Sequence, residues 1–228
     1  MPSAIITGAS RGLGLALARA LARDSWRLAL DARGGAALAA AADELAALTD
    51  VVALAGDVAE PAHRRELVGA AGDRVDLLVN NASLLGPSPQ PALGAYPIEE
   101  LERVYRANVF APLALAQLVL PRLPDGATIL NVTSDAAVEP YAGWGGYGSS
   151  KAALEQLTAI LAAEHLALRI YAVDPGDMRT RMHQEAFPGE DISGRPEPEE
   201  SVPGLLALID GELPSGRYRA RELSGVTT

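Results

Sequence analysis

The alternation of two kinds of segment constrains the fold of this chain more than any other feature. Short runs rich in β-branched residues and leucine are separated by longer Ala/Leu segments with helical periodicity. This is the arrangement expected of βαβ units, in which helices join parallel strands and cover both faces of one sheet. We therefore predict an α/β fold with a doubly wound parallel sheet. The predicted strands are 4–7, 27–30, 51–55, 77–79, 128–132 and 170–173, with an edge strand near Tyr218.

Length and charge limit the organisation and the partners of the protein. A chain of 228 residues predicts one domain, 1–228, because single α/β cores reach this size. The net charge of −10 argues against nucleic acids and anionic membranes, which bind clustered Lys and Arg. The sequence has no cysteine, which excludes disulfides and thiolate metal sites and is compatible with the cytoplasm, where we expect the protein. We also predict no signal peptide and no membrane segment, since the apolar windows 13–22 and 109–120 are too short to span a bilayer.

A glycine-rich turn, TGASRGLG at 7–14, follows the first predicted strand and leads into a helical segment. Three glycines there let the backbone approach a pyrophosphate, and the helix N-terminus supplies amide donors and a positive dipole end. The turn lacks the lysine of a phosphate-binding P-loop. A methyltransferase that binds a methyl-donor nucleotide has a similar turn, so this motif alone leaves the chemistry open.

The segment YGSSK at 147–151 opens another helical pattern. Tyr147 and Lys151 are four residues apart and share one helix face. Bringing a tyrosine pKa from about 10 to about 7 takes roughly 4 kcal/mol of preference for the phenolate. A neighbouring ammonium and a cationic nicotinamide are able to supply that preference. The alternative is an ordinary surface tyrosine and lysine on one helix.

Four motifs in fixed order resemble the short-chain dehydrogenase/reductase family over nearly the whole chain. They are TGASRGLG, NNA at 80–82, Ser134 after the fifth strand, and YGSSK. The resemblance implies a Rossmann-type domain that moves a hydride between a nicotinamide and a small-molecule carbonyl or alcohol substrate. It implies that Tyr147 is the general acid/base, that Lys151 binds the nicotinamide ribose and lowers the tyrosine pKa, and that Ser134 orients the substrate oxygen.

The same resemblance suggests Asn108, in the run 107–109, as the residue that helps hold a proton-relaying water. The alternative for Asn108 is a helix-bending or capping role beside Pro112. Ser83 stands where the family's NNAG motif has glycine, and we expect only a small local adjustment. For Asp57 the alternative is a solvated loop carboxylate. The implied cofactor contacts are Gly8, Ser10, Arg11, Gly12, Leu13, Gly14, Arg33, Asp57, Val58, Asn81, Ala82, Tyr147, Lys151, Pro175, Gly176 and Thr180.

Charge near the second strand predicts the cofactor. An acidic residue at the selecting position would bind the ribose 2′-hydroxyl of NAD, whereas arginines favour the 2′-phosphate of NADP. Our register places Ala32 there, not Asp31, so Arg11 and Arg33 favour NADP over NAD. A shift of one residue would reverse this prediction.

The stretch 187–203 is rich in Pro, Gly and acidic residues, which predicts an irregular loop within a substrate lid at about 177–203. We expect His63 and His165 to be solvated, His183 to lie in the lid, and no metal to be bound, since no carboxylates stand at metal-ligand spacing. The resemblance suggests an apolar substrate pocket formed by Met178, Met182, Phe187, Trp144, Tyr141, Val138 and Leu84.

Two other functions remain open. The epimerase and dehydratase branch of the superfamily shares the YxxxK pair, but those proteins usually carry a longer C-terminal region. A non-catalytic NADP-binding sensor or regulatory protein would typically lose the tyrosine or the lysine, and both are present here. The family commonly assembles through helices equivalent to 99–120 and 147–164, so we expect a homodimer or homotetramer.

Overall fold

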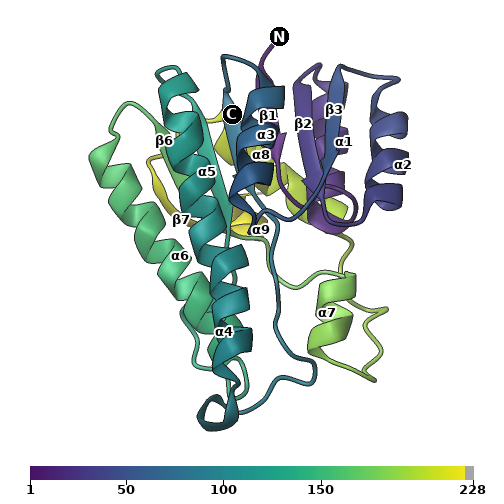
Figure 1. The fold of residues 1–228 in the computed structure, drawn as a ribbon, viewed down its shortest axis with the longest axis vertical. Coiled ribbons are helices and arrows are strands. Elements are labelled where there is room, and N and C mark those ends of the chain that lie inside the picture. Colours follow the sequence, from purple (N-terminus) through teal and green to yellow (C-terminus); the bar gives the residue numbers. More distant parts are fainter. Residues whose placement is uncertain (224–228) are drawn as a thin grey trace.

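A seven-stranded parallel sheet forms the centre of the protein in a computed structural model that describes residues 1–223 (Figure 1). The strand order is β3-β2-β1-β4-β5-β6-β7, and every neighbouring pair is parallel. The predicted fold and strands are confirmed, with ends shifted by at most two residues. Residues 224–228 of the predicted domain lie outside the described residues. The strands are β1 (Ser3–Ile6), β2 (Arg27–Ala32), β3 (Val51–Ala55), β4 (Leu77–Asn80), β5 (Thr128–Val132), β6 (Arg169–Asp174) and β7 (Gly216–Arg219).

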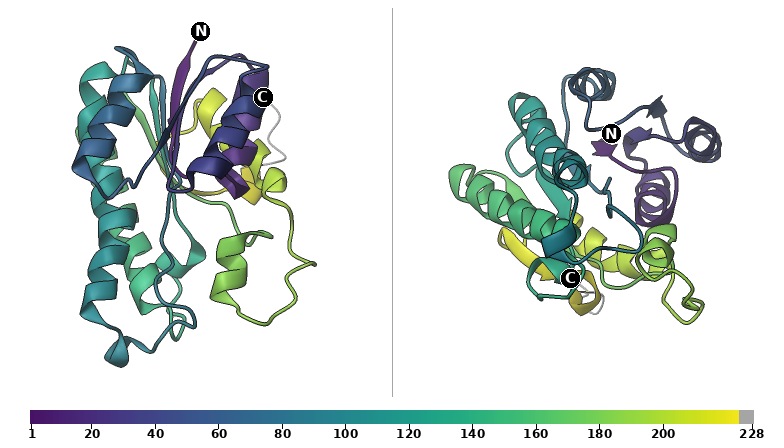
Figure 2. Two further views of the ribbon diagram at one scale, coloured as in Figure 1. Left: turned by 45° about the vertical axis from the view of Figure 1, so that its right-hand side comes forward. Right: turned by 60° about the horizontal axis from the view of Figure 1, so that its bottom comes forward.

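Helices cover both faces of this sheet, as Figures 1 and 2 show. Because side chains alternate along a strand, Ile5 and Ile6 of β1 pack on opposite faces, and both are fully buried. One face carries α1 (Gly12–Arg23), α2 (Gly35–Leu45) and α8 (Val202–Asp210). The other carries α3 (Pro61–Ala71), α5 (Ala111–Val119) and α6 (Gly145–Glu164).

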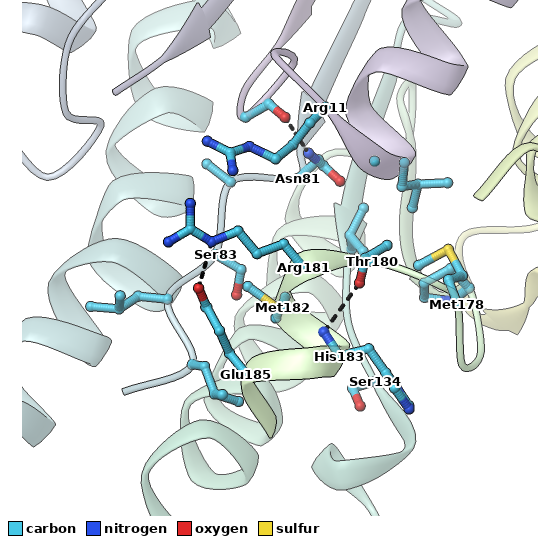
Figure 3. A pocket seen from close by; sticks show the side chains of 18 of the residues that line it. Arg11, Asn81, Ser83, Ser134, Met178, Thr180, Arg181, Met182, His183 and Glu185 are labelled. Carbon is cyan, nitrogen blue, oxygen red and sulfur yellow. Dashed lines mark hydrogen bonds and ion pairs between the residues drawn. The ribbon is translucent and has the colours of Figure 1, made fainter. Parts of the chain in front are cut away.

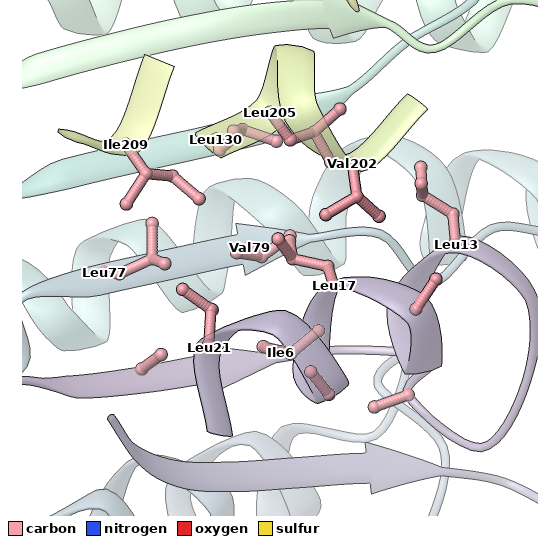
Figure 4. Packing of buried hydrophobic residues seen from close by; sticks show 14 of the residues in the cluster. Ile6, Leu13, Leu17, Leu21, Leu77, Val79, Leu130, Val202, Leu205 and Ile209 are labelled. Carbon is pink, nitrogen blue, oxygen red and sulfur yellow. The ribbon is translucent and has the colours of Figure 1, made fainter. Parts of the chain in front are cut away.

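The larger core lies between the sheet and the α1/α8 layer (Figure 4). Leu17 and Leu21 of α1 are four residues apart, and so are Leu205 and Ile209 of α8. Each pair therefore presents one apolar face to the strands. Burial of one such side chain contributes about 1.5–3 kcal/mol, so this layer holds α1 firmly against β1 and β4.

The direction of chain progress reverses between β1 and β4. From β1 the chain passes through α1 to β2 on one side, whereas β4 pairs with β1 on the other. Loops that leave the carboxyl ends of these two strands therefore diverge and open a crevice. This crevice is where the predicted site residues were expected to gather.

A long helical stretch, Ile98–Arg122, crosses the α3/α5/α6 face. It comprises α4 (Ile98–Tyr105), a π-helical turn (Arg106–Phe110), α5 and a 3₁₀ turn (Leu120–Arg122). By length and composition alone this stretch is long and apolar enough to cross a membrane, with a mean hydropathy of 1.2. Within its most apolar window 44% is buried inside the fold, and α5 packs on α3 and β4. This is weak evidence for a membrane span, because core helices of α/β proteins have the same composition.

The prediction of an irregular loop over 187–203 is wrong at its C-terminal end. A 3₁₀ helix spans Pro198–Ser201, and α8 begins at Val202 with Pro203 in its first turn. Proline is tolerated there because its missing N–H would have no intrahelical partner. A short helix, α7 (Arg181–Ala186), lies within the predicted lid segment, and α9 (Ala220–Leu223) follows β7.

Candidate active site

A cavity of about 1520 Å³ opens at the carboxyl edge of the sheet and extends from the glycine turn to α7 (Figure 3). All but two of the residues predicted for the site line it. The exceptions are Gly14 and Asn108, which lie behind its wall. Residues that follow β1 to β6 and residues of α6 (Gly145–Glu164) are thus brought together in one place.

The glycine turn has the geometry that its sequence requires. Gly8 and Gly12 have φ angles of +67° and +56°, in the left-handed region that favours glycine. At Gly14 a Cβ would stand 2.6 Å from both Asn81 Nδ2 and the Gly8 carbonyl oxygen. The absence of a side chain at Gly14 therefore lets α1 pack closely against Gly8 and Asn81. The N-cap residue Arg11 offers no side-chain acceptor to the first helical amides, which point toward the cavity mouth.

Thr7 and Asn81 join the glycine turn to the loop after β4. The Thr7 hydroxyl accepts hydrogen bonds from the backbone N–H groups of Asn81 (3.0 Å) and Ala82 (2.9 Å). In return, Asn81 Nδ2 donates to the carbonyl oxygens of Thr7 (2.8 Å) and Gly8 (3.2 Å). The two strand ends at the crevice are thereby fixed relative to each other.

The predicted catalytic residues meet at one wall of the cavity. Tyr147 is 8% exposed and lines the cavity together with Ser134 and Ser83. Lys151 is 2% exposed, its Nζ donates to the Val132 carbonyl oxygen at 2.8 Å, and the same nitrogen lies 5.5 Å from the centre of the Tyr147 ring. A surface tyrosine and lysine would not show this burial.

Burial dominates the ionisation of both groups. Loss of hydration raises the pKa of Tyr147 to about 12, although the nearby hydroxyls of Ser83 and Ser134 oppose the rise. It lowers the pKa of Lys151 to about 7, and Glu155 opposes that change only in part. The sequence predicted a lowered tyrosine pKa, whereas the described residues alone raise the pKa of Tyr147. The lowered pKa of Lys151 weakens the positive charge beside the phenolate, and the charges of Asp174 and Asp135 further disfavour the phenolate.

Asn108 lies in the π-helical turn between α4 and α5 and is fully buried. Its Oδ1 accepts from the Leu84 N–H (2.8 Å), and its Nδ2 donates to the Leu84 carbonyl oxygen (2.9 Å) and to Ser150 Oγ (3.0 Å). π-turns of this kind are frequent at functional sites. The side chain holds the Leu84 loop and α6 together, and the water-holding role of Asn108 stays a prediction.

His63 is buried, which corrects the prediction that it is solvated. Its Nε2 lies 3.0 Å from Asp31 Oδ2, and Asp31 Oδ1 accepts from the Gly8 N–H at 3.0 Å. Burial is the largest influence on Asp31 and raises its pKa, while the bonds to Gly8 and His63 lower it. Both carboxylate oxygens of Asp31 are thus engaged by the protein itself.

The remaining predicted cofactor contacts border the cavity from several loops. The Asp57 carboxylate accepts from the Ala59 N–H (2.8 Å), and Val58 beside it is buried. Gly176 has a φ of +75°, and its N–H donates to Asp174 Oδ1 (2.9 Å). Thr180 caps α7 by accepting from the His183 N–H (3.2 Å; Figure 3), and its Cγ2 lies 3.6 Å from where a Gly12 Cβ would be.

Arg11 and Arg33 bring positive charge to the cofactor end of the cavity. Neither guanidinium forms an ion pair with any residue from 1 to 223, although both line the cavity. The glycine turn places Arg11 near Gly34, since its Nη2 lies 3.8 Å from where a Gly34 Cβ would be. The two arginines therefore lie at the same corner of the cavity, beside the end of β2, and we call this part of the cavity the arginine corner.

An aromatic wall covers Tyr147 from the side of the predicted lid. The ring of Trp144 lies 5.9 Å from that of Tyr147 and 5.7 Å from that of Phe187. Of the predicted apolar pocket residues, Val138 is the one outside the lining and is 52% exposed. Sequence analysis missed Arg103, Arg106 and Arg181, which also line the cavity. Each pairs with a glutamate on its own helix, a pattern typical of any solvated helix face.

Comparisons with known proteins agree with this geometry. A family model described as short chain dehydrogenase matches residues 2–191. The chain belongs to the short-chain dehydrogenase family. It is 35% identical to a 3-oxoacyl-acyl-carrier-protein reductase of rhamnolipid biosynthesis from Pseudomonas aeruginosa, over 98% of this chain and 86% of that protein. This short-chain dehydrogenase is thus an NAD(P)-dependent oxidoreductase by family.

Two solved structures are also similar to it. A short chain dehydrogenase from Salmonella enterica has a TM-score of 0.87 and 27% identity, over 96% of each chain. An alcohol dehydrogenase from Thermococcus sibiricus, complexed with 5-hydroxy-NADP, has a TM-score of 0.86 and 28% identity, over 100% of this chain and 99% of that one. Within residues 1–223 of the present dehydrogenase, no group of three or more His, Asp or Glu residues is placed to hold a metal ion.

Lys151 is the one lysine in the sequence, so its ionisation is open to direct measurement. We expect Lys151→Met to be more stable than wild type by about 1–3 kcal/mol at neutral pH, because methionine needs no hydration. The folded pKa of about 7 lies below the ordinary 10.5, so the cost of burying Lys151 is largest below pH 7 and fades as pH rises toward 10.5.

Urea unfolding of both proteins at about pH 6 and about pH 9 measures this difference. Nuclear magnetic resonance of isotope-labelled lysine gives the pKa of the single side chain, and the methionine variant confirms the assignment. A variant that is less stable than wild type at both pH values, or a lysine that titrates near 10.5, would contradict the account.

Proposed function

We propose that this short-chain dehydrogenase is an NADP-preferring carbonyl reductase or alcohol dehydrogenase with Tyr147 as its general acid/base. The observation that carries the proposal is the convergence of Tyr147, Lys151 and Ser134 on a cavity whose other end holds two unpaired arginines. The intact set argues against the sensor alternative, which has no use for a buried lysine beneath a tyrosine.

The residues present fit a nicotinamide dinucleotide. The glycine turn lacks Cβ atoms where a pyrophosphate would approach, and the first amides of α1 are available as donors. The proposed contacts are those that line the cavity from the glycine turn, the ends of β2 to β4 and the segment after β6. The cofactor supplies or accepts the hydride at the carbonyl carbon.

Tyr147 supplies the proton in this scheme. Burial keeps its phenol protonated at neutral pH, which is the form that carbonyl reduction requires. Its proton passes to the carbonyl oxygen as the carbon is reduced, and Ser134 holds that oxygen. Alcohol oxidation requires the phenolate, which the positive charges of protonated Lys151 and an oxidised nicotinamide would stabilise.

The preference for NADP over NAD follows from the arginine corner, which Arg11 and Arg33 form beside β2. Both carboxylate oxygens of Asp31 already contact Gly8 and His63, and its side chain is buried, so Asp31 is a poor partner for a ribose 2′-hydroxyl. Arg11 and Arg33 remain unpaired and suit a 2′-phosphate. The solved Thermococcus sibiricus alcohol dehydrogenase, which contains an NADP derivative, is in line with this preference.

The first test compares wild type with Tyr147→Phe. NADPH consumption is measured over a panel of ketones and aldehydes, and NADPH binding is followed by fluorescence. We expect turnover to fall by at least about a thousandfold, because general acid catalysis contributes roughly 10²–10⁴ and the phenol also positions the carbonyl. Binding should persist. Tight binding without turnover in wild type would support a sensor, and no binding at all would refute the proposal.

The arginine corner is tested by Arg11→Ala and Arg33→Ala. Each is expected to weaken NADPH binding about tenfold or more while changing NADH binding little, because only NADPH carries the 2′-phosphate. Arg65→Ala, an exposed arginine outside the cavity, is the matched control. Equal losses for NADPH and NADH would mean that these arginines do not select the cofactor.

We also propose that residues 177–203 form the substrate lid, that the protein is cytoplasmic, and that it is a homodimer or homotetramer. Phe110, between α4 and α5, is 57% exposed, and Ile160 on α6 is 43% exposed, on the helices expected to form the interface. Light scattering of the purified protein at micromolar concentration should give two or four times the chain mass. A monomer under these conditions would rule out the assembly.

A further inference from the structure

Arg217 lies outside the lining of the cavity but connects three elements that end at it. It belongs to the edge strand β7, and its side chain is 27% exposed. Its Nε donates to Glu155 Oε1 at 2.9 Å, and its Nη2 donates to the Ser134 carbonyl oxygen (3.3 Å) and to Asp174 Oδ2 (3.3 Å). One guanidinium thus joins α6, the end of β5 and the end of β6, and the fixed fork of arginine donors suits such a bridge.

Three consecutive residues at the end of β5 each bond a different charged side chain. The pairs are Val132 with Lys151 (2.8 Å), Thr133 with Glu155 (2.7 Å) and Ser134 with Arg217 (3.3 Å). Lys151 and Glu155 are four residues apart on α6 and share one face of that helix. The end of β5 is therefore bonded to this face of α6 at two points, and Arg217 completes the network from β7.

The network contains two carboxylates of low exposure beside the proton-transfer group. The Glu155 side chain is 15% exposed and that of Asp174 is 7% exposed. Burial is the largest influence on Lys151, and Glu155 opposes it by raising the lysine pKa. Burial is also the largest influence on Tyr147, and Asp174 adds to the rise of the tyrosine pKa. Arg217 is the cation bonded to both carboxylates, so it offsets the charge that each one presents to the pair.

We propose that Arg217 is a positioning residue for Tyr147 and Lys151, which fixes the backbone of Ser134 against α6 and neutralises the two carboxylates that it bonds. It contacts no substrate and transfers no proton. Its effect is indirect, because it keeps the Ser134 hydroxyl in place at the cavity and preserves the ionisation of Lys151. The inference rests on the proposed function, in which Ser134 holds the substrate oxygen and Lys151 acts on the tyrosine.

Charged groups stand around Tyr147 and Lys151 on several elements packed against α6. They are Glu155 on α6 itself, Asp135 after β5, Asp174 at the end of β6, Arg217 on β7, and Arg103 and Arg106 from α4 and the π-helical turn. Arg103 and Arg106 are 62% and 64% exposed, so solvent screens their charge. Glu155 and Asp174 are the two carboxylates bonded to Arg217, and a shift in its absence is attributable to them.

The first test is the ionisation of Lys151, measured by nuclear magnetic resonance of isotope-labelled lysine in the cofactor-free protein. Arg217→Gln should raise the lysine midpoint by about one pH unit, because Glu155 then lacks its cation. Glu155→Gln alone should lower the midpoint, and the double variant should return it to near the wild-type value. Arg219→Gln is the matched control, since Arg219 is 53% exposed on the same strand and pairs with Glu222.

A kinetic measurement tests the position of Ser134 separately. Arg217→Lys keeps the charge but loses the fork that reaches the Ser134 carbonyl oxygen. We expect kcat for NADPH-dependent carbonyl reduction to fall about tenfold and KM to change less than about twofold, because a small displacement of an orienting hydroxyl slows the chemical step. Arg219→Lys is the control and should keep the wild-type kcat.

Two results would overturn the inference. One is a lysine midpoint that stays in place in Arg217→Gln while only the melting temperature falls, which would mean that Arg217 merely holds the edge strand. The other is a wild-type kcat in Arg217→Lys, and this variant decides the matter if Arg217→Gln does not fold. Absence of turnover in wild type on any carbonyl would instead defeat the proposed function, and the lysine titration would still decide the role of Arg217.

Discussion

The arrangement of the site depends on the hydrogen bonds between Thr7 and Asn81. They lock the end of β1 to the end of β4 at the point where the strand order reverses. From Asn81 the chain passes at once to Ser83 and Leu84, which bond Asn108 and thereby the π-helical turn. Asn108 in turn reaches Ser150, the neighbour of Lys151 on α6. One continuous set of polar contacts thus connects the cofactor turn to the proton-transfer group.

Burial of ionisable groups gives the site its chemical character at a cost in stability. The chain as a whole is acidic, yet the cavity contains a buried lysine and two unpaired arginines. In a dehydrated site a neutral phenol and a neutral amine are favoured, so the described residues suit proton donation at neutral pH. Added positive charge would reverse that preference. The same pair of side chains is therefore compatible with both directions of the reaction.

The sequence predicts the fold well because its signals are local and repeated. Each strand is a short apolar run between helical segments, and glycine spacing at 7–14 already determines the turn. What the sequence could not predict depends on partners far apart in the chain. His63 is buried because Asp31, on another element, accepts its hydrogen bond. The hydrogen bond of Ser83 with Asn108 joins the loop after β4 to the π-helical turn, and no local pattern reveals it.

Other differences between expectation and structure have similarly physical causes. Proline marked 187–203 as irregular, but the first turn of a helix tolerates proline, so α8 begins earlier than the composition indicates. The lowered tyrosine pKa was predicted from a charged Lys151 together with a cationic nicotinamide, and burial lowers the pKa of Lys151 and so weakens the first of these two charges. Spacing on a helix shows which residues meet, but the hydration of each group depends on the complete fold.

The most direct test of the account is a crystal structure of this protein with NADP⁺. The account predicts the pyrophosphate at the glycine turn, the 2′-phosphate in ion-pair contact with Arg11 and Arg33, and the nicotinamide beside Tyr147 with its ribose on Lys151. Cofactor bound with its nicotinamide away from Tyr147, or a 2′-phosphate that contacts neither arginine, would contradict the assignment of this cavity as the site of hydride transfer.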